Sequence, residues 1–119
     1  MSLYERLGAS EGINNIAHDI VENHFANPAI SSRFNNMKLT AEELKSSAAK
    51  FFIAGTGGPV DYQGKDMLLT HKGMNVSAIE FMAVLDDVLE ALTKHEIGQR
   101  EQEEVLFILY SFRSDIILK

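Results

Sequence analysis

The sequence predicts an all-α protein, and three observations carry the prediction. Apolar residues recur every three to four positions along almost the whole chain, which is the spacing of one helix face. Directly before three of the apolar-periodic stretches, Ser or Thr precedes Glu by three residues, which is the spacing of a helix capping box. No stretch alternates convincingly between apolar and polar residues, as a half-buried β-strand would.

The N-terminal third predicts one short helical turn and one long helix. Ser2 and Glu5 form the first capping box and open the turn. We expect Ser10 to cap the long helix, which ends at Asn27 and Pro28 because the residue before proline disfavours the α conformation. A continuous stripe along this helix contains Ile13, Ile16, Ala17, Ile20, Val21 and His24.

Three more long helices are expected. Thr40 and Glu43 cap the second long helix, which the glycine-rich run 55–59 stops. Ser77 and Glu80 cap the third, and the fourth follows Gly98 and runs on to Ile116. Between the second and third, residues 57–76 contain too many glycines for one long helix. Within that stretch, a turn over residues 66–71 would bring Met67, Leu68 and His71 to one face.

Composition bounds the function. The 119 residues suit one domain, 1–119, and their net charge of −6 argues against a nucleic-acid binder. The absence of cysteine excludes disulfides, zinc–thiolate sites, iron–sulfur clusters and thioether-linked haem. No segment approaches the roughly 20 apolar residues of a membrane span, and the N-terminus has no apolar signal region. We therefore expect a cytoplasmic protein without a membrane partner.

The histidines are the main candidates for chemistry. His18, His24, His71 and His95 stand alone, without the paired spacing of a zinc site. No nucleophile elbow, phosphate loop or His-Glu-x-x-His motif is present, and the glycine-rich run 55–58 follows a helix and no strand, so it reads as a helix stop.

One histidine in an apolar helical cage suits haem, which needs a proximal nitrogen and a flat apolar slot. Aromatic walls for such a slot could come from Phe34, Phe51, Phe52, Tyr62 and Phe81. Residue types alone still favour an ordinary core or surface histidine over a haem ligand.

A series of short motifs resembles the group I truncated haemoglobins, from Ser2 to about Leu109. The motifs are, in order, residues 2–8, Asn27-Pro28, Phe34, Phe51-Phe52, Gly57-Gly58-Pro59, Tyr62-x-Gly64, Met67-x3-His71-x-Gly73-Met74 and Phe81. The resemblance implies a two-over-two helical sandwich around haem b (iron protoporphyrin IX). It also implies His71 as the proximal iron ligand and Phe34 packed against the porphyrin.

Further contacts with the cofactor are expected from Leu44, Met67 and Val84, and from the aromatic residues already named. Lys72 and Tyr62 are the first candidates to bind the haem propionates, with Lys45 and Lys50 behind them; a solvated lysine face is the alternative. Val84, Val105 and Leu109 fall where relatives have side chains that line a ligand tunnel, and dense core packing is an equal alternative.

The chain departs from the family in the distal pocket. Where group I members have a tyrosine that donates a hydrogen bond to O2, this chain has Val21, with Ile20 where a phenylalanine is usual. Ala48 replaces an assisting glutamine, and Leu44 completes an apolar wall. O2 on ferrous haem carries partial negative charge, so losing one or two donors should raise its dissociation rate roughly tenfold to several hundredfold. CO and NO binding should be kept.

The leading hypothesis is therefore a gas-binding haem protein. An NO dioxygenase, a haem-based gas-sensing module and a haem-free helical adaptor remain as alternatives. His24 could bind a distal ligand or the iron, although packing at the haem edge is favoured, while His95 is expected to be structural. Expected partners are a diatomic gas and an electron-donating reductase, and the chain should be a monomer or weak dimer.

Overall fold

The computed structural model describes residues 1–59 and 73–119, and every regular element in these ranges is helical. The elements are α1 (Leu3–Arg6), α2 (Ala9–Ala26), the 3-10 helix η1 (Ser31–Phe34), α3 (Ala41–Gly55), α5 (Ala78–Lys94), α6 (Gln99–Tyr110) and α7 (Arg113–Ile116). The all-α prediction is confirmed. None of these helices combines the length and apolarity that a bilayer crossing requires.

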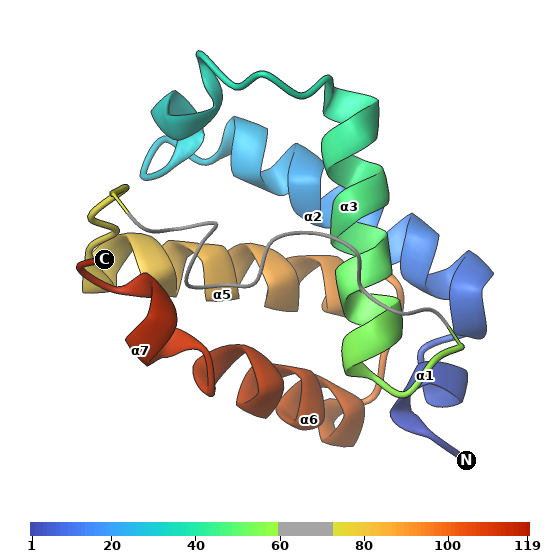
Figure 1. The fold of residues 1–119 in the computed structure, drawn as a ribbon. Coiled ribbons are helices and arrows are strands. Elements are labelled where there is room, and N and C mark those ends of the chain that lie inside the picture. The colour runs from blue at the N-terminus through green and yellow to red at the C-terminus, as the bar shows by residue number, and fades with distance from the viewer. Residues whose placement is uncertain (60–72) are drawn as a thin grey trace.

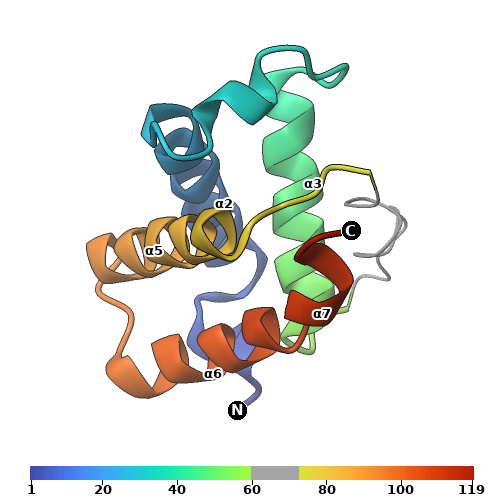
Figure 2. The ribbon, with the colours of Figure 1, turned by 90° about the vertical axis from the view of Figure 1, so that its left-hand side faces the viewer.

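Two helix pairs form the body of the molecule. Helix α2 packs against both α3 and α5, while α5 in turn contacts α6. Figure 1 shows α3 crossing α2 steeply, with α5 running beside α2 and α6 beyond α5. The view turned by 90° shows α7 folding back from the end of α6 towards α3 (Figure 2).

All three predicted capping boxes form. In each, the Ser or Thr side chain accepts a hydrogen bond from the backbone N–H of the glutamate, whose side chain accepts from the cap N–H in return. The hydroxyls of Ser2, Thr40 and Ser77 lie 3.2, 3.1 and 3.0 Å from those N–H nitrogens. These bonds span three residues, so sequence alone predicts them.

The prediction that Ser10 caps α2 is wrong. The cap is Gly8, whose φ of +98° lies in the left-handed region that glycine adopts without strain. Ser10 stands inside the first turn, where its N–H donates to the hydroxyl of Tyr4 at 3.1 Å. A side chain of the preceding helix thus satisfies a free N–H of α2.

The prediction of one unbroken helix from Gly98 to Ile116 is also wrong, because this segment forms two helices, α6 and α7. At the division, the N–H of Phe112 donates to the carbonyl of Leu109, three residues back, and the Ser111 hydroxyl donates to the carbonyl of Ile108. This tighter turn ends α6. The Phe112 ring lies 5.7 Å from that of Phe51 on α3.

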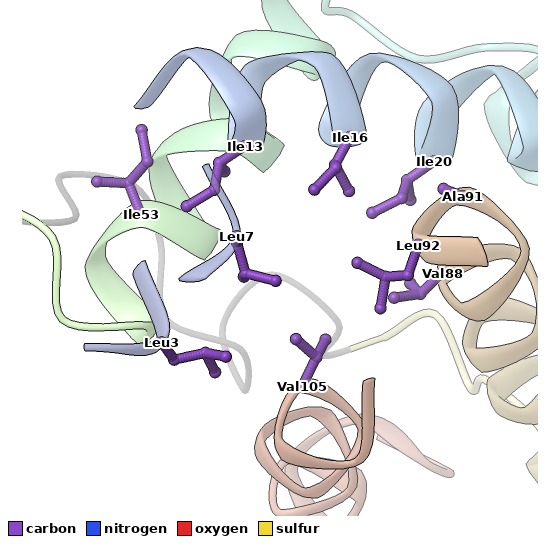
Figure 3. Packing of buried hydrophobic residues seen from close by; sticks show 10 residues of the cluster. All are labelled: Leu3, Leu7, Ile13, Ile16, Ile20, Ile53, Val88, Ala91, Leu92 and Val105. Carbon is purple, nitrogen blue, oxygen red and sulfur yellow. The ribbon is translucent and has the colours of Figure 1, made fainter. Parts of the chain in front are cut away.

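One apolar core joins five helices. Its buried members, shown converging in Figure 3, are Leu3, Leu7, Ile13, Ile16, Ile20, Ile53, Val88, Ala91, Leu92 and Val105. Leu7 is the C-cap of α1, and the others come from α1, α2, α3, α5 and α6. Val21 is buried as well but is not part of this cluster, so it faces a different part of the interior from Ile20.

The C-terminal residues 117–119 pair with residues 73–76, which precede α5. Val76 and Ile117 form an isolated parallel bridge, and the N–H of Leu118 donates to the Val76 carbonyl at 2.8 Å. The N–H of Gly73 donates to the carbonyl of Lys119 at 2.7 Å. These bonds anchor residues 73–76 before α5 begins.

Candidate functional site

The predicted distal wall draws on two packed helices. Val21 on α2 is 2% exposed, whereas Leu44 and Ala48 on α3 are half-buried. Leu44 and Ala48 are four residues apart and so share one face of α3. The structure thus places all three apolar residues on the helices α2 and α3, which pack against each other.

An ion pair joins the two helices beside this wall. The Nζ atom of Lys45 lies 2.6 Å from a carboxylate oxygen of Glu22 and 3.7 Å from one of Glu42. Lys45 follows Leu44 and Glu22 follows Val21 in the chain. The ion pair therefore joins α2 and α3 directly next to these two residues of the predicted wall. It also occupies Lys45, which the sequence offered as a candidate for a haem propionate.

The polar residues that follow Val21 are all engaged elsewhere. Glu22 binds Lys45, and the side-chain amide of Asn23 donates to the backbone carbonyl of Asp87 at 3.0 Å. The Nδ1 atom of His24 lies 2.7 Å from Oδ2 of Asp87. In this stretch of α2, each of these polar side chains therefore has a partner within the protein.

Phe34 lies against α2. Its ring stacks on His24 with centroids 6.1 Å apart and an interplanar angle of 6°, and it meets the Phe25 ring edge-on at 5.4 Å. Phe34 closes the 3-10 helix η1, which the sequence did not predict. The half-buried position of Phe34 leaves part of the ring uncovered.

The other side chains predicted to contact haem differ in burial. Phe52 packs against the core cluster, while its neighbour Phe51 meets it edge-on at 5.4 Å. Phe81 on α5 is buried and Val84, one turn further, is half-buried. The exposed position of Lys50 leaves its ammonium in solvent.

Four of the predicted site residues, Tyr62, Met67, His71 and Lys72, lie outside the described residues. The proximal ligand and the first propionate candidates therefore stay predictions. Within residues 1–59 and 73–119, no group of three or more His, Asp or Glu side chains is arranged to hold a metal ion.

Of the three residues that the resemblance compares with a ligand tunnel, Val105 is packed in the core, whereas Val84 and Leu109 are half-buried. Val105 is 2% exposed and belongs to the core cluster, with Leu109 half-buried against it. A void of about 10 Å³ lies in this core, lined by Leu7, Ile13, Ile16, Ile20, Phe52, Val88, Leu92 and Val105. That volume is at the lower limit for one water molecule. The packing favours the dense-core alternative for Val105.

Two histidines meet one carboxylate near the middle of α2, five residues before His24. The Oδ2 atom of Asp19 lies 2.7 Å from Nε2 of His95 and 3.3 Å from Nζ of Lys94, and its Oδ1 lies 3.3 Å from Nδ1 of His18. Burial raises the pKa of Asp19, but the hydrogen bonds from His95, His18 and Lys94 outweigh it, so the pKa is lowered overall. His95 is the C-cap of α5, and this contact fits the structural role expected for it.

Sequence reasoning missed Asp87. A signal was available, since Asp87 lies four residues from both Ala83 and Ala91 and so shares their buried face of α5. A charged residue on such a face requires partners. Those partners, His24 and Asn27, come from α2 and its C-cap.

Comparisons with known proteins agree with this architecture. The family model described as bacterial-like globin matches residues 2–117. A group 1 truncated hemoglobin of Mycolicibacterium paratuberculosis is 27% identical over 105 residues, which are 88% of this chain and 76% of that protein. One from Tetrahymena pyriformis is 23% identical over 118 residues, covering 99% of this chain and 96% of its own.

Solved structures share the fold. The crystal structure of the truncated hemoglobin from Tetrahymena pyriformis in its Fe(III) form superposes with a TM-score of 0.94, at 23% identity and full coverage of both chains. The 2/2 hemoglobin from Synechococcus, solved in the cyanomet state with covalently attached heme, gives 0.89 at 20% identity, with 98% of each chain covered. The predicted two-over-two architecture is confirmed.

Proposed function

The chain belongs to the bacterial-like globin family, and on that basis we propose that it binds haem b and takes diatomic gases at a pocket with an apolar distal wall. Membership of the family supports a haem-containing, gas-binding protein. The identity of the proximal ligand, the form of the haem and the gas preference are the parts that we propose. The apolar wall of Val21, Leu44 and Ala48 is the observation that carries the gas preference.

The described residues suit a flat apolar group. Phe34, Leu44, Ala48, Phe51 and Val84 are apolar yet only half-buried, and they come from η1, α3 and α5. Apolar side chains left half-covered gain from a further apolar surface. The absence of cysteine supports haem b over a thioether-linked haem.

Each residue has a part in this proposal. His71 would hold the iron, Phe34 and Val84 would pack against the porphyrin, and Lys72 would bind a propionate. When bound, the haem supplies an iron atom that accepts a gas as its ligand. The protein then chooses among gases through the side chains that surround them.

The absence of a hydrogen-bond donor in the distal wall determines the proposed gas preference. Val21, Leu44 and Ala48 carry no hydrogen-bond donor, and the polar residues next to Val21 are committed to Lys45 and Asp87. Because O2 gains far more from a donor than CO does, the wall should give fast O2 dissociation and ordinary CO binding. Nothing in this stretch of α2 favours the NO dioxygenase alternative, which needs a long-lived oxygenated form. The reductase, the monomeric or weakly dimeric state and the cytoplasmic location stay predictions.

Absorption spectra of the haem-loaded protein test the proposal. Ferric and ferrous spectra, with and without CO, should be recorded for the wild type, for His71→Ala and for His18→Ala. His18 is the matched control because its side chain is 55% exposed. We expect a five-coordinate ferrous spectrum that shifts with CO, is lost in His71→Ala and is kept in His18→Ala.

Two results would contradict the proposal. No Soret band after haem addition would exclude haem binding. A six-coordinate ferrous spectrum without CO would mean that a side chain of the protein occupies the gas site, with His24 the first residue to replace.

A further inference from the structure

Asp87 is a buried carboxylate held between α5 and the end of α2. The residue is 4% exposed. Its Oδ1 accepts a hydrogen bond from the side-chain amide of Asn27 at 3.0 Å, and its Oδ2 lies 2.7 Å from Nδ1 of His24. The side-chain amide of Asn23 donates to the backbone carbonyl of the same residue at 3.0 Å. Three side chains from α2 and its cap thus converge on one residue of α5.

The chemistry of this contact determines the tautomer of His24. An ionised carboxylate only accepts hydrogen bonds, so Nδ1 of His24 must carry the proton. A carboxylate that receives one ring nitrogen also orients the imidazole, as the outer-shell partners of metal-bound histidines do. His24 therefore has one ring orientation and, in its neutral form, a proton on Nδ1.

The oriented imidazole lies against Phe34. The two rings are nearly parallel, and Phe25 touches the Phe34 ring edge-on. The side chain of His24 is only 13% exposed, so its ring has little room to turn. The contacts thus run from Asp87 through His24 to the Phe34 ring.

We propose that Asp87 and His24 form a positioning pair for Phe34, in which the carboxylate fixes the imidazole and the imidazole fixes the phenyl ring against the haem. The inference rests on the proposed haem binding, since Phe34 is the residue expected to pack on the porphyrin. His24 then acts through Phe34 and need not touch the gas or the iron. This role agrees with the expectation from the sequence that His24 packs at the haem edge.

The molecule contains a matched control. Asp19 and His95 form a second carboxylate–imidazole contact, also 2.7 Å long, between α2 and the C-cap of α5. It joins α2 to the C-cap of α5 and involves neither His24 nor Phe25, whose rings contact Phe34. Asp19→Asn therefore loses the same kind of tie without touching the proposed pair.

The informative variant is Asp87→Asn. Asparagine keeps an oxygen for the amide of Asn27 but presents an NH2 group to Nδ1 of His24, so the neutral ring should move its proton to Nε2. The ¹⁵N shifts of the His24 ring report that proton, and the ¹H shifts of the Phe34 ring, displaced by the porphyrin ring current, report its position. Both are measured on the haem-loaded ferrous CO protein.

For Asp87→Asn we expect the His24 proton to change nitrogen and the Phe34 signals to shift. Haem transfer to an excess of a haem-free acceptor protein should become roughly three- to tenfold faster, the effect of one lost hydrogen bond. Asp19→Asn should change none of the three readouts. A His24→Phe protein provides the background in which Asp87→Asn should shift the Phe34 signals no further, because the connecting imidazole is gone.

Three results would overturn the positioning role. They are a wild-type His24 protonated at Nε2 in its neutral form, Phe34 signals unchanged in Asp87→Asn, and Phe34 signals that shift as much in Asp19→Asn. Each can occur in a protein with a normal Soret band, so the proposed haem binding would survive it. A wild-type protein without a Soret band would remove the proposed function instead.

Discussion

The guanidinium of Arg33 donates two hydrogen bonds to the carboxylate of Glu80, one of them at 2.8 Å from Nη2 to Oε1. The same carboxylate accepts the backbone N–H of Ser77 at 3.0 Å, completing the capping box of α5. Arg33 also donates to the carbonyl of Met74 at 2.8 Å. One ion pair therefore anchors η1, directly before Phe34, to the first turn of α5.

This pair should make stability depend on acid pH. The hydrogen bond from Arg33, followed by that from Ser77, lowers the pKa of Glu80 from 4.5 to about 2. Since the folded-state pKa is the lower one, the stabilisation is complete above the unfolded value and is lost as the pH falls from about 4.5 to about 2. We expect Glu80→Gln to lower the free energy of unfolding by about 1 kcal/mol at neutral pH and by almost nothing near pH 2.

Urea unfolding across this pH range checks the prediction. The control is Glu90→Gln, which changes an exposed glutamate of the same helix. A Glu80→Gln deficit that stays constant from neutral pH to pH 2 would show that the charge of Glu80 is not its source.

A donor placed in the distal wall should slow O2 release. We expect Val21→Tyr to lower the O2 dissociation rate by roughly tenfold or more and to change the CO rate little, because a hydrogen bond favours O2 selectively. Val21→Phe is the control, since it adds a ring of similar size without the hydroxyl. Stopped-flow ligand replacement measures both rates, and equal O2 rates in the two variants would contradict the assignment of Val21 to the wall.

Gly58 should not tolerate a side chain. A Cβ atom there would lie 2.6 Å from both Cγ2 of Ile53 and Cδ1 of Tyr4 and 2.8 Å from the carbonyl oxygen of Ile53. We expect Gly58→Ala to lower the free energy of unfolding by about 1–3 kcal/mol, the usual cost of overpacking. Gly55→Ala has no atom within 4 Å of the new Cβ, so it should be neutral or slightly stabilising. Denaturant unfolding of both variants distinguishes steric crowding from a general loss of glycine flexibility.

Leu92 should be among the costly core positions. It is 1% exposed and borders the small void beside Val88 and Val105. Leu92→Ala should lower the free energy of unfolding by about 2–5 kcal/mol through lost burial and an enlarged cavity. Ile79→Ala, at a position 77% exposed, should change it by less than about 0.5 kcal/mol. Similar losses at both positions in chemical unfolding would contradict the placement of the core.

Local hydrogen bonds and helix periodicity explain what could be predicted of the fold. Each capping box lies within four residues, and the breaks at Asn27-Pro28 and Gly55 follow from backbone sterics. The two errors have longer-range or competing causes. Ser10 does not cap α2 because the helix begins earlier, after Gly8 in a left-handed conformation. The hydroxyl of Tyr4 accepts the hydrogen bond from the Ser10 N–H.

In the candidate site, too, some features follow from local sequence and others depend on residues far apart in the chain. The motif order and the absence of a donor at Val21, Leu44 and Ala48 can be read from residue identities, so the family and the apolar character of the proposed wall follow from the sequence alone. Which polar side chains stand beside that wall depends on partners far along the chain: His24 meets Asp87 63 residues away. Only the packing of α2 against α5 decided this, because burying a carboxylate requires donors and the nearest helix in space supplied them.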